Sequence, residues 1–213
     1  MPKKKSPSAT PFCKVCFRDL GKDNLLLLGR ATLPLCQRCY REMNPVFLRW
    51  VTSGVRFTAI YPYEDVLRSL IFQFKGCGDV ELAPVFLAYP LTLLRLRYRR
   101  YVVVPAPSHE EDDCVRGFNH VQEMFASLGL PIVKAIRKTG KRKQSDCSAE
   151  ERTHIGNFLA FDSQADLKGK NVLFVDDVYT TGSTARACIA LLRKAGVKKV
   201  EGLVIARTPK KEK

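Results

Sequence analysis

A short apolar run that leads directly into two acidic residues constrains this chain more than any other segment. Residues 172–175 read Val-Leu-Phe-Val, and Asp176 and Asp177 follow them. Apolar runs of this length, bounded by turn residues, are typical of strands buried on both faces of a parallel sheet. Because ligands of open α/β sheets bind beyond the carboxyl ends of the strands, we expect the two acids to lie in a ligand crevice.

The turn after the acids has the composition of a phosphate-binding loop. Its residues offer hydroxyl groups or conformational freedom, and they are Thr180, Thr181, Gly182, Ser183 and Thr184. A helix that begins in this turn and runs to about Lys194 would direct free backbone N–H groups at an anion. Two adjacent carboxylates can accept hydrogen bonds from vicinal hydroxyls or hold a hydrated Mg²⁺. The segment therefore predicts a ribose-phosphate site.

Two other interpretations of the segment are open on the residues alone. It could be a strand followed by an ordinary capped helix, with both acids in solvent. It could also be an acidic pocket of the receiver type, but such a pocket expects its acid pair after the first strand. Here the pair lies late in the chain, at residues 176–177 of 213.

The same segment resembles the phosphoribosyl-pyrophosphate motif of type I phosphoribosyltransferases. That motif consists of an apolar strand, two acids and a Thr-Thr-Gly-x-Thr loop, and residues 172–184 follow it throughout. The resemblance implies that Asp176 and Asp177 lie on the 2′ and 3′ hydroxyls of the ribose. It also implies that the loop from Thr180 to Thr184 holds the 5′-phosphate.

Four cysteines near the N-terminus form two C-x2-C pairs, Cys13 with Cys16 and Cys36 with Cys39. Four thiolates at this spacing predict a tetrahedral Zn²⁺ site. Two disulfides or four buried cysteines are the alternatives, and disulfides would require an exported chain. A four-cysteine set leaves no open coordination position, and this part of the chain has little apolar material for a core. We therefore expect the zinc to be structural.

The remaining features favour a cytoplasmic protein. No apolar signal segment follows the basic residues 3–5, and residues 6–11 have the composition of a disordered tail. The richest apolar run, 82–94, is shorter than a bilayer span and contains two prolines, so we expect no membrane span. The other cysteines are scattered at spacings that suggest no disulfide pairs, which fits a reducing compartment. They are Cys77, Cys114, Cys147 and Cys188.

Strand and helix candidates alternate along the rest of the chain. The strand candidates are an entry strand after residue 51 and segments 101–104, 132–136, 171–175 and 200–206. The helix candidates are an amphipathic segment through Leu67, Leu70, Ile71 and Phe74, and segments 119–128 and 183–194. This alternation predicts the α/β class, with a largely parallel sheet flanked by helices, as in type I phosphoribosyltransferases.

The expected domain organisation has four parts. They are a disordered basic tail (1–11), a zinc-ribbon-like module (12–50), a phosphoribosyltransferase-like domain (51–209) and a second basic tail (210–213).

Further segments narrow the resemblance to the ComF family. They are Arg-Gly-Phe-Asn at 116–119, the Gln-Ser segment at 144–152, Phe-Lys-Gly at 74–76 and Gly-Asp at 78–79. Members of this family combine an N-terminal zinc-ribbon-like module with a phosphoribosyltransferase-type domain. They are associated with DNA uptake in naturally competent bacteria, so the resemblance implies a role in handling imported single-stranded DNA.

The resemblance also implies a pyrophosphate-binding turn after the strand at 101–104. Ala106, Pro107 and Ser108 would present backbone groups to the diphosphate, and Arg116 would add positive charge. A mobile basic flap is expected just before residue 144. Its candidate cations are Arg137, Lys138, Lys141, Arg142 and Lys143, and the alternative for this run is a solvated loop.

One stretch departs from the family pattern. ComF proteins commonly have basic residues just before Arg-Gly-Phe-Asn, whereas this chain has His109 followed by Glu110, Glu111, Asp112 and Asp113. Like charges beside a diphosphate are unfavourable unless water or Mg²⁺ screens them. We therefore expect that these acids point outward or that the pyrophosphate half of the site has decayed.

Charge suggests a polyanionic partner. The chain has 36 basic and 21 acidic residues and a formal net charge of +15, which favours single-stranded DNA. The basic residues cluster at 95–100, 134–143 and 210–213. Aromatic candidates for base stacking are Tyr98, Tyr101, Phe17 and Tyr40; the alternative is weak nonspecific attraction, with the aromatics in the core.

Two other functional classes stay open. The chain could be an active phosphoribosyltransferase that uses Mg²⁺ and transfers phosphoribosyl to a nitrogenous base with release of pyrophosphate; the sequence names no catalytic residue for it. It could also be a scaffold that contacts a competence helicase or a recombination-loading protein through the zinc module.

Overall fold

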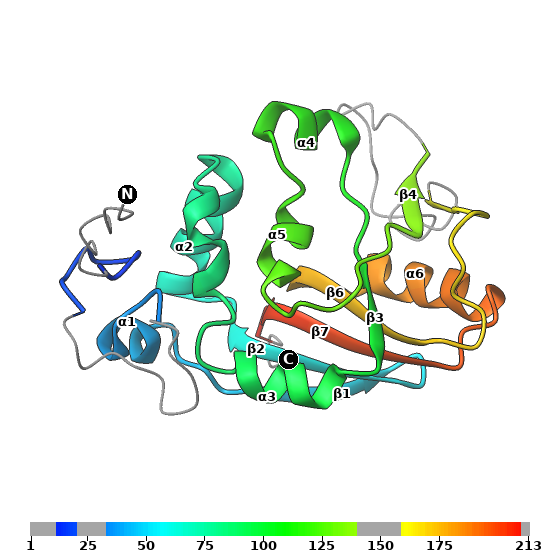
Figure 1. Ribbon diagram of the computed structural model, residues 1–213, viewed down its shortest axis with the longest axis horizontal. Coiled ribbons are helices and arrows are strands. Elements are labelled where there is room, and N and C mark those ends of the chain that lie inside the picture. The colour runs from blue at the N-terminus through cyan, green and yellow to red at the C-terminus, as the bar shows by residue number, and fades with distance from the viewer. Residues whose placement is uncertain (1–11, 21–32, 140–158, 210–213) are drawn as a thin grey trace, which may run out of the picture.

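The structure of the protein is a computed structural model, and the residues it describes are 12–20, 33–139 and 159–209. This part of the chain contains a five-stranded sheet (Figure 1). In spatial order its strands are β1 (Leu48–Thr52), β2 (Val55–Pro62), β7 (Lys199–Arg207), β6 (Asn171–Tyr179) and β3 (Tyr101–Pro105). Only the β1–β2 pair in this sheet is antiparallel. The predicted α/β class with a mostly parallel sheet is thus confirmed.

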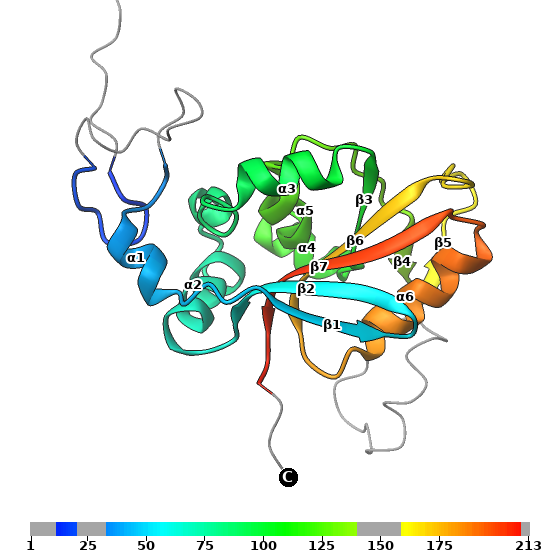
Figure 2. The same ribbon diagram turned by 90° about the horizontal axis from the view of Figure 1, so that it is seen from below.

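Helices cover both faces of the sheet (Figure 2). On one face lie α2 (Asp65–Gly76), η1 (Val80–Val85), α3 (Leu91–Tyr98) and α5 (His120–Ala126). On the other lie α6 (Ser183–Lys194) and a small antiparallel sheet of β4 (Ile136–Lys138) and β5 (Leu159–Phe161). The remaining helices are α1 (Gln37–Glu42) and α4 (Glu110–Arg116).

The central strand β6 explains why the sequence carries a continuous apolar run. Leu173 and Val175 belong to the core under α2 and α5, whereas Val172 and Phe174 belong to the core under α6. Side chains alternate across a strand, so a strand covered on both faces needs apolar residues at every position. Its acidic residues, Asp176 and Asp177, therefore come after the apolar run, near its carboxyl end.

Most predicted elements are present, but the strand predicted at 132–136 is wrong. Only Ile132 pairs with the main sheet, as a single bridge to Val103. The N–H of Ala135 then donates to the carbonyl of Val133 at 2.9 Å, which turns the chain away. The strand resumes at Ile136 in the separate β4–β5 sheet.

The cysteine module packs against the domain that holds the sheet. Cys13, Leu35 and Met43 are buried in the same core cluster as the residues of α2 and η1. The ring of Tyr40 stacks on Tyr89 with 3.9 Å between the centroids. The predicted boundary at residue 51 falls inside β1. The division into domains stays a prediction, and the two predicted tails lie outside the described residues.

A helix that crosses a membrane must be both long and apolar. No helix within residues 12–20, 33–139 and 159–209 has both properties.

Candidate ligand site

The loop after β6 is shaped by Gly182 at the N-terminus of α6. Its φ is 73°, and a Cβ at this position would lie 2.0 Å from the hydroxyl oxygen of Tyr179. Only glycine fits such an approach, because a side chain would have to displace the buried tyrosine. The hydroxyl oxygens of Thr181 and Ser183 lie 3.0 Å apart at the start of the twelve-residue helix. The loop thus presents hydroxyls and helix N–H groups together, which is an anion-binding arrangement.

The two acids lie at the carboxyl end of β6 and fix their own backbone. Asp176 Oδ1 accepts from the N–H of Asp177 at 2.9 Å, and Asp177 Oδ1 accepts from the N–H of Val178 at 2.7 Å. Asp177 is buried, whereas Asp176 is partly exposed. The second carboxylate oxygen of Asp177 faces α2 and α5, where it lies 2.9 Å from Lys75 Nζ and 3.4 Å from His120 Nε2.

The surroundings drive the pKa values of the two acids apart. Although Asp176 is partly exposed, desolvation raises its pKa above the ordinary value, and the charge of Asp177 adds to the rise. Burial also acts to raise the pKa of Asp177, but the hydrogen bond from His120 and the charge of Lys75 outweigh it and leave this pKa below its ordinary range. Asp177 is therefore the acid of the pair that ionises more readily. Asp176 retains a proton more readily and can both donate to and accept from a ribose hydroxyl.

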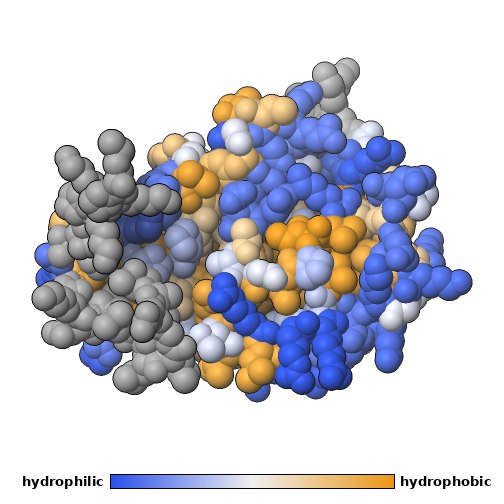
Figure 3. Space-filling view, viewed as in Figure 1, coloured by the Kyte–Doolittle hydropathy of each residue, from blue (hydrophilic) through white to orange (hydrophobic). Residues whose placement is uncertain are grey.

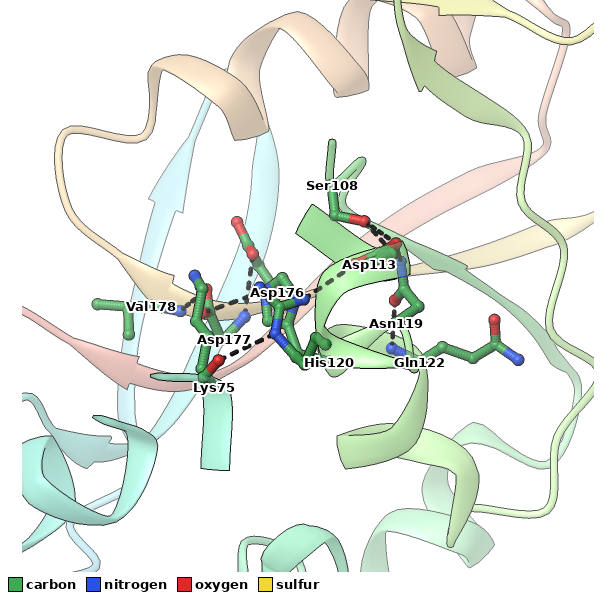
Figure 4. Close-up of polar contacts among 10 residues, drawn as sticks. Lys75, Ser108, Asp113, Asn119, His120, Gln122, Asp176, Asp177 and Val178 are labelled. Carbon is green, nitrogen blue, oxygen red and sulfur yellow. Dashed lines mark hydrogen bonds and ion pairs between the residues drawn. The ribbon is translucent and has the colours of Figure 1, made fainter. Parts of the chain in front are cut away.

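A second polar cluster surrounds Asp113 of α4 (Figure 4). Asp113 Oδ2 accepts from the hydroxyl of Ser108 and from Asn119 Nδ2, the latter at 2.7 Å. Asp113 Oδ1 accepts from Arg116 Nη1 at 3.0 Å. Two of the residues assigned to a pyrophosphate turn, Ser108 and Arg116, are thus bound to an acid of the chain itself.

Arg116 and His120 join the two clusters. Arg116 Nε donates to the carbonyl of Lys75 at 2.9 Å, and its Nη1 lies 3.3 Å from His120 Nδ1. A neutral imidazole with its hydrogen on Nε2 satisfies both neighbours of His120, because Arg116 donates to Nδ1 and Nε2 donates to Asp177. The structure thus gathers Asp177, Ser108 and Arg116 into one network.

The network also includes three residues that were not predicted to belong to a site. They are Lys75, Asn119 and His120, which come from α2 and from the start of α5. Lys75 and Asn119 lie inside the segments that resemble the ComF family, so those segments were the available signal. Nothing in the sequence pattern singled out His120.

A pocket of about 290 Å³ lies beside the loop that contains Gly182. Trp50, Thr180, Thr181 and Arg207 are among the residues that line it. The Arg207 guanidinium lies 4.1 Å from the centroid of the Trp50 ring. Trp50 in turn meets Tyr179 edge-on, with 4.9 Å between the centroids. The wall of this pocket therefore continues into the tyrosine that supports Gly182.

Comparison with known proteins decides the family. Residues 115–213 match the phosphoribosyl transferase domain. Adenine phosphoribosyltransferase of Actinobacillus succinogenes is 37% identical over 147 residues, which cover 68% of this chain and 76% of the relative. The chain belongs to the phosphoribosyltransferase family.

Within this family the chain is similar to ComFC proteins. Competence protein ComFC of Streptococcus pneumoniae is 28% identical over 199 residues, which cover 92% of this chain and 86% of the relative. ComFC of Bacillus subtilis is 28% identical over 70% of this chain and 63% of its own length. The resemblance to the ComF family is confirmed.

One solved structure is adenine phosphoribosyltransferase of Saccharomyces cerevisiae. It aligns with a TM-score of 0.41 and 18% identity over 81% of this chain and 89% of that chain.

The four N-terminal cysteines of this phosphoribosyltransferase-family chain form one cluster. The sulfurs of Cys13, Cys16, Cys36 and Cys39 all lie within 4.8 Å of one another, and Cys16 and Cys36 are 3.8 Å apart. Zinc–sulfur bonds of about 2.3 Å in a tetrahedron place sulfurs about 3.8 Å apart. The N–H of Cys36 also donates to Cys13 Sγ at 3.3 Å, as is suitable for a thiolate. The cluster has the donors and spacing to hold a zinc ion.

The aromatic residues suggested for base stacking have different environments. Tyr98 is only 1% exposed, so the prediction that it is available to a base is wrong. The hydroxyl of Tyr101 donates to Glu201 at 3.0 Å, and Tyr40 is stacked on Tyr89. Phe17 of the cysteine module is 77% exposed and available.

The basic clusters are described only in part. Strongly hydrophilic side chains gather over the end of α3 and the start of β3 in the face drawn in Figure 3, where Arg99 and Arg100 are exposed. In the flap segment, Lys141, Arg142 and Lys143 lie outside the described residues, as do the segments 144–152 and 210–213.

Proposed function

We propose that this chain binds phosphoribosyl pyrophosphate together with Mg²⁺ at the carboxyl edge of the sheet, and supports the handling of imported single-stranded DNA in the cytoplasm. The Gly182 loop carries the proposal, because hydroxyls and helix N–H groups converge there beside Asp176 and Asp177. The loop would hold the 5′-phosphate and the two acids would hold the ribose hydroxyls. Competence is the setting named for the ComFC relatives, and we extend it to this chain.

Calorimetry tests the ligand. The native chain is titrated with phosphoribosyl pyrophosphate and Mg²⁺, beside the double variant Asp176→Asn, Asp177→Asn. Glu201→Gln is the matched control, because it neutralises a buried acid on a neighbouring strand at the opposite edge of the sheet. Binding by the native chain and the control but not by the double variant is expected. A folded, zinc-loaded native chain that binds no ligand would contradict the proposal.

The complete transfer reaction is a second candidate, favoured by the similarity to adenine phosphoribosyltransferases. The base nitrogen would form a bond to the anomeric carbon while the bond from that carbon to the diphosphate oxygen breaks, and the proton of that nitrogen would pass to solvent. Mg²⁺ would stabilise the charge of the leaving diphosphate. Pyrophosphate release is measured with adenine, guanine, hypoxanthine or uracil as acceptor; release with none of them, from a chain that binds the ligand, would leave binding as the function.

Binding of single-stranded DNA is measured by fluorescence anisotropy with a labelled oligothymidylate at increasing KCl. Contacts to phosphates release counterions, so the affinity should fall steeply with salt. The variant Arg99→Gln, Arg100→Gln tests the exposed cations beyond α3, and Arg18→Gln, Arg41→Gln removes two exposed cations from the cysteine module as a control. An affinity that does not depend on salt would exclude a phosphate-dominated interface.

The zinc-ribbon-like module is proposed to hold a structural zinc and to offer a surface to a competence helicase or a recombination-loading protein. One zinc per chain is expected by mass spectrometry of the metal, and removal by a chelator should unfold the module. Copurification with such a protein, lost when Phe17 is changed to Ser, would support the docking role.

A further inference from the structure

Helix α4 brings four acids to the turn that the family uses for pyrophosphate, but the acids do not share one environment. Glu110, Glu111 and Asp112 are exposed, whereas the side chain of Asp113 is turned inward and is 22% exposed. Its helix ends at Gly117, whose φ of 82° closes the last turn with a bond from its N–H to the carbonyl of Asp113. Both the backbone and the side chain of Asp113 are therefore held in place.

The groups that Asp113 contacts are those that a diphosphate would need. The hydroxyl of Ser108 donates its single hydrogen to Asp113 and accepts from Asn119 at 2.7 Å. Arg116 has a side chain that is only 10% exposed, and it is divided among Asp113, His120 and the carbonyl of Lys75. A carboxylate offers these donors the same kind of charged oxygen as a phosphate does.

The loop that would hold the 5′-phosphate has no such carboxylate bound to its hydroxyls among the described residues. The hydroxyls of Thr181 and Ser183 contact each other instead, at the start of α6. The two halves of the ligand would therefore meet different surroundings. The 5′-phosphate would enter an open loop, but the diphosphate would have to displace a bound carboxylate.

We infer that Asp113 is a resident anion that stands in for the diphosphate, so that the native chain holds 5-phosphoribosyl ligands by their ribose 5-phosphate half alone. This inference rests on the proposed phosphoribosyl site and names its ligand class. Ribose 5-phosphate should bind about as tightly as phosphoribosyl pyrophosphate, because the diphosphate gains no contact and meets the charge of Asp113. Asp113 is thus a residue that determines specificity at this site.

The experiment compares two ligands on three chains. Ribose 5-phosphate and phosphoribosyl pyrophosphate, each with Mg²⁺, are titrated by calorimetry into the native chain, Asp113→Asn and Asp112→Asn. The last variant removes the same charge one residue away at an exposed position, and so controls for long-range electrostatics. In the native chain and in the control, the two affinities should lie within about threefold of each other, because the diphosphate adds no net contact.

In Asp113→Asn, the affinity for phosphoribosyl pyrophosphate should rise by about tenfold or more, since freed charge-assisted donors can meet the diphosphate. The affinity for ribose 5-phosphate should not change. Adding Arg116→Gln to Asp113→Asn should remove most of the gain, whereas Arg116→Gln alone should leave the ratio of the two affinities unchanged. If Asp113→Asn fails to fold, Asp113→Ser carries the same expectation.

Three results would overturn the inference. A native preference for phosphoribosyl pyrophosphate of tenfold or more would mean that the diphosphate is bound despite Asp113. A loss of phosphoribosyl pyrophosphate affinity in Asp113→Asn would mean that Asp113 holds the Mg²⁺ of the ligand. An equal rise in Asp112→Asn would mean that only net charge matters. Absence of binding for both ligands in all chains would instead refute the phosphoribosyl site itself, and the inference with it.

Discussion

Asp177 and Glu201 are both buried carboxylates on neighbouring central strands, but they lie at opposite edges of the sheet. Asp177 is 7% exposed near the carboxyl end of β6, and Glu201 is 4% exposed near the amino end of β7. Glu201 contacts three cations and a hydroxyl, and its partners are Arg56, Arg97, Lys199 and Tyr101. Asp177 contacts Lys75 and His120.

Glu201 and Asp177 differ in the elements from which their partners come. Arg56, Lys199 and Tyr101 stand at or near the first residues of the strands themselves, so Glu201 fastens the amino edge of the sheet. The partners of Asp177, in contrast, come from the helices α2 and α5 rather than from the strands of the sheet. Glu201 thus serves the structure at one edge of the sheet, and we propose that Asp177 serves ligand binding at the other.

The largest effect is expected from Gly202→Ala, beside Glu201. A Cβ there would lie 2.2 Å from the ring of Phe57, which is 1% exposed and cannot move into solvent. Overpacking of this kind should lower the free energy of unfolding by about 3 kcal/mol. Urea denaturation measures it. Ligand affinity per folded molecule should stay unchanged, and a selective loss of affinity would break the division between the two edges.

Asp177→Asn should have the converse effect. The affinity for ribose 5-phosphate should fall by about 100-fold, or about 2.7 kcal/mol, because a buried carboxylate that would accept from a ribose hydroxyl is lost. Stability should change less than in Gly202→Ala, since Lys75 is partly exposed and can be solvated. Calorimetry and urea denaturation on the same sample separate the two readouts. An unchanged affinity would show that Asp177 does not contact the ligand.

Glu201→Gln should lower the free energy of unfolding by about 1–2 kcal/mol, because a charged hydrogen-bond acceptor with four partners becomes neutral. Burial opposes ionisation of Glu201, but the hydrogen bonds from Lys199, Arg97 and Tyr101 lower its pKa to about 2. A folded-state pKa below the unfolded one stabilises the protein at higher pH.

The stabilisation that the ionised Glu201 carboxylate provides is present in full above about pH 4.5 and is lost as the pH falls towards about 2. The stability difference between the native chain and Glu201→Gln should therefore shrink between pH 5 and pH 3. A difference that is constant over this range would show that Glu201 gains nothing from its cations.

Lys199→Ala should give the smallest effect, about 0.5 kcal/mol or less. Its ammonium lies 2.7 Å from Glu201, but its side chain is 45% exposed and pairs of this kind are screened by water. Thermal denaturation at low and high salt measures the difference. A loss of stability as large as that of Glu201→Gln would show that Lys199 alone, rather than the group of cations, provides the stabilising effect of Glu201.

The sequence predicted what is local and missed what packing brings together. The strand before Asp176, the helix at 183–194 and the four-cysteine cluster follow from short patterns of apolar residues, hydroxyls and spacing. The contact of Lys75 with Asp177 joins residues 102 positions apart, and no local pattern specifies it. The same limit applies to Asp113. The sequence showed that four acids stand where a diphosphate was expected, but only the structure of α4 shows that Asp113 turns inward and the other three do not.

The position of Trp50 gives the protein an internal optical reporter. It is the single tryptophan of the chain, and it contacts the guanidinium of Arg207 and the ring of Tyr179, which supports Gly182. Trp50 also lines the pocket that Thr180 and Thr181 border. A ligand bound beside these threonines should therefore change the surroundings of the indole. The intrinsic emission, measured without any attached label, should follow ligand binding in real time and give the rate at which the site fills and empties.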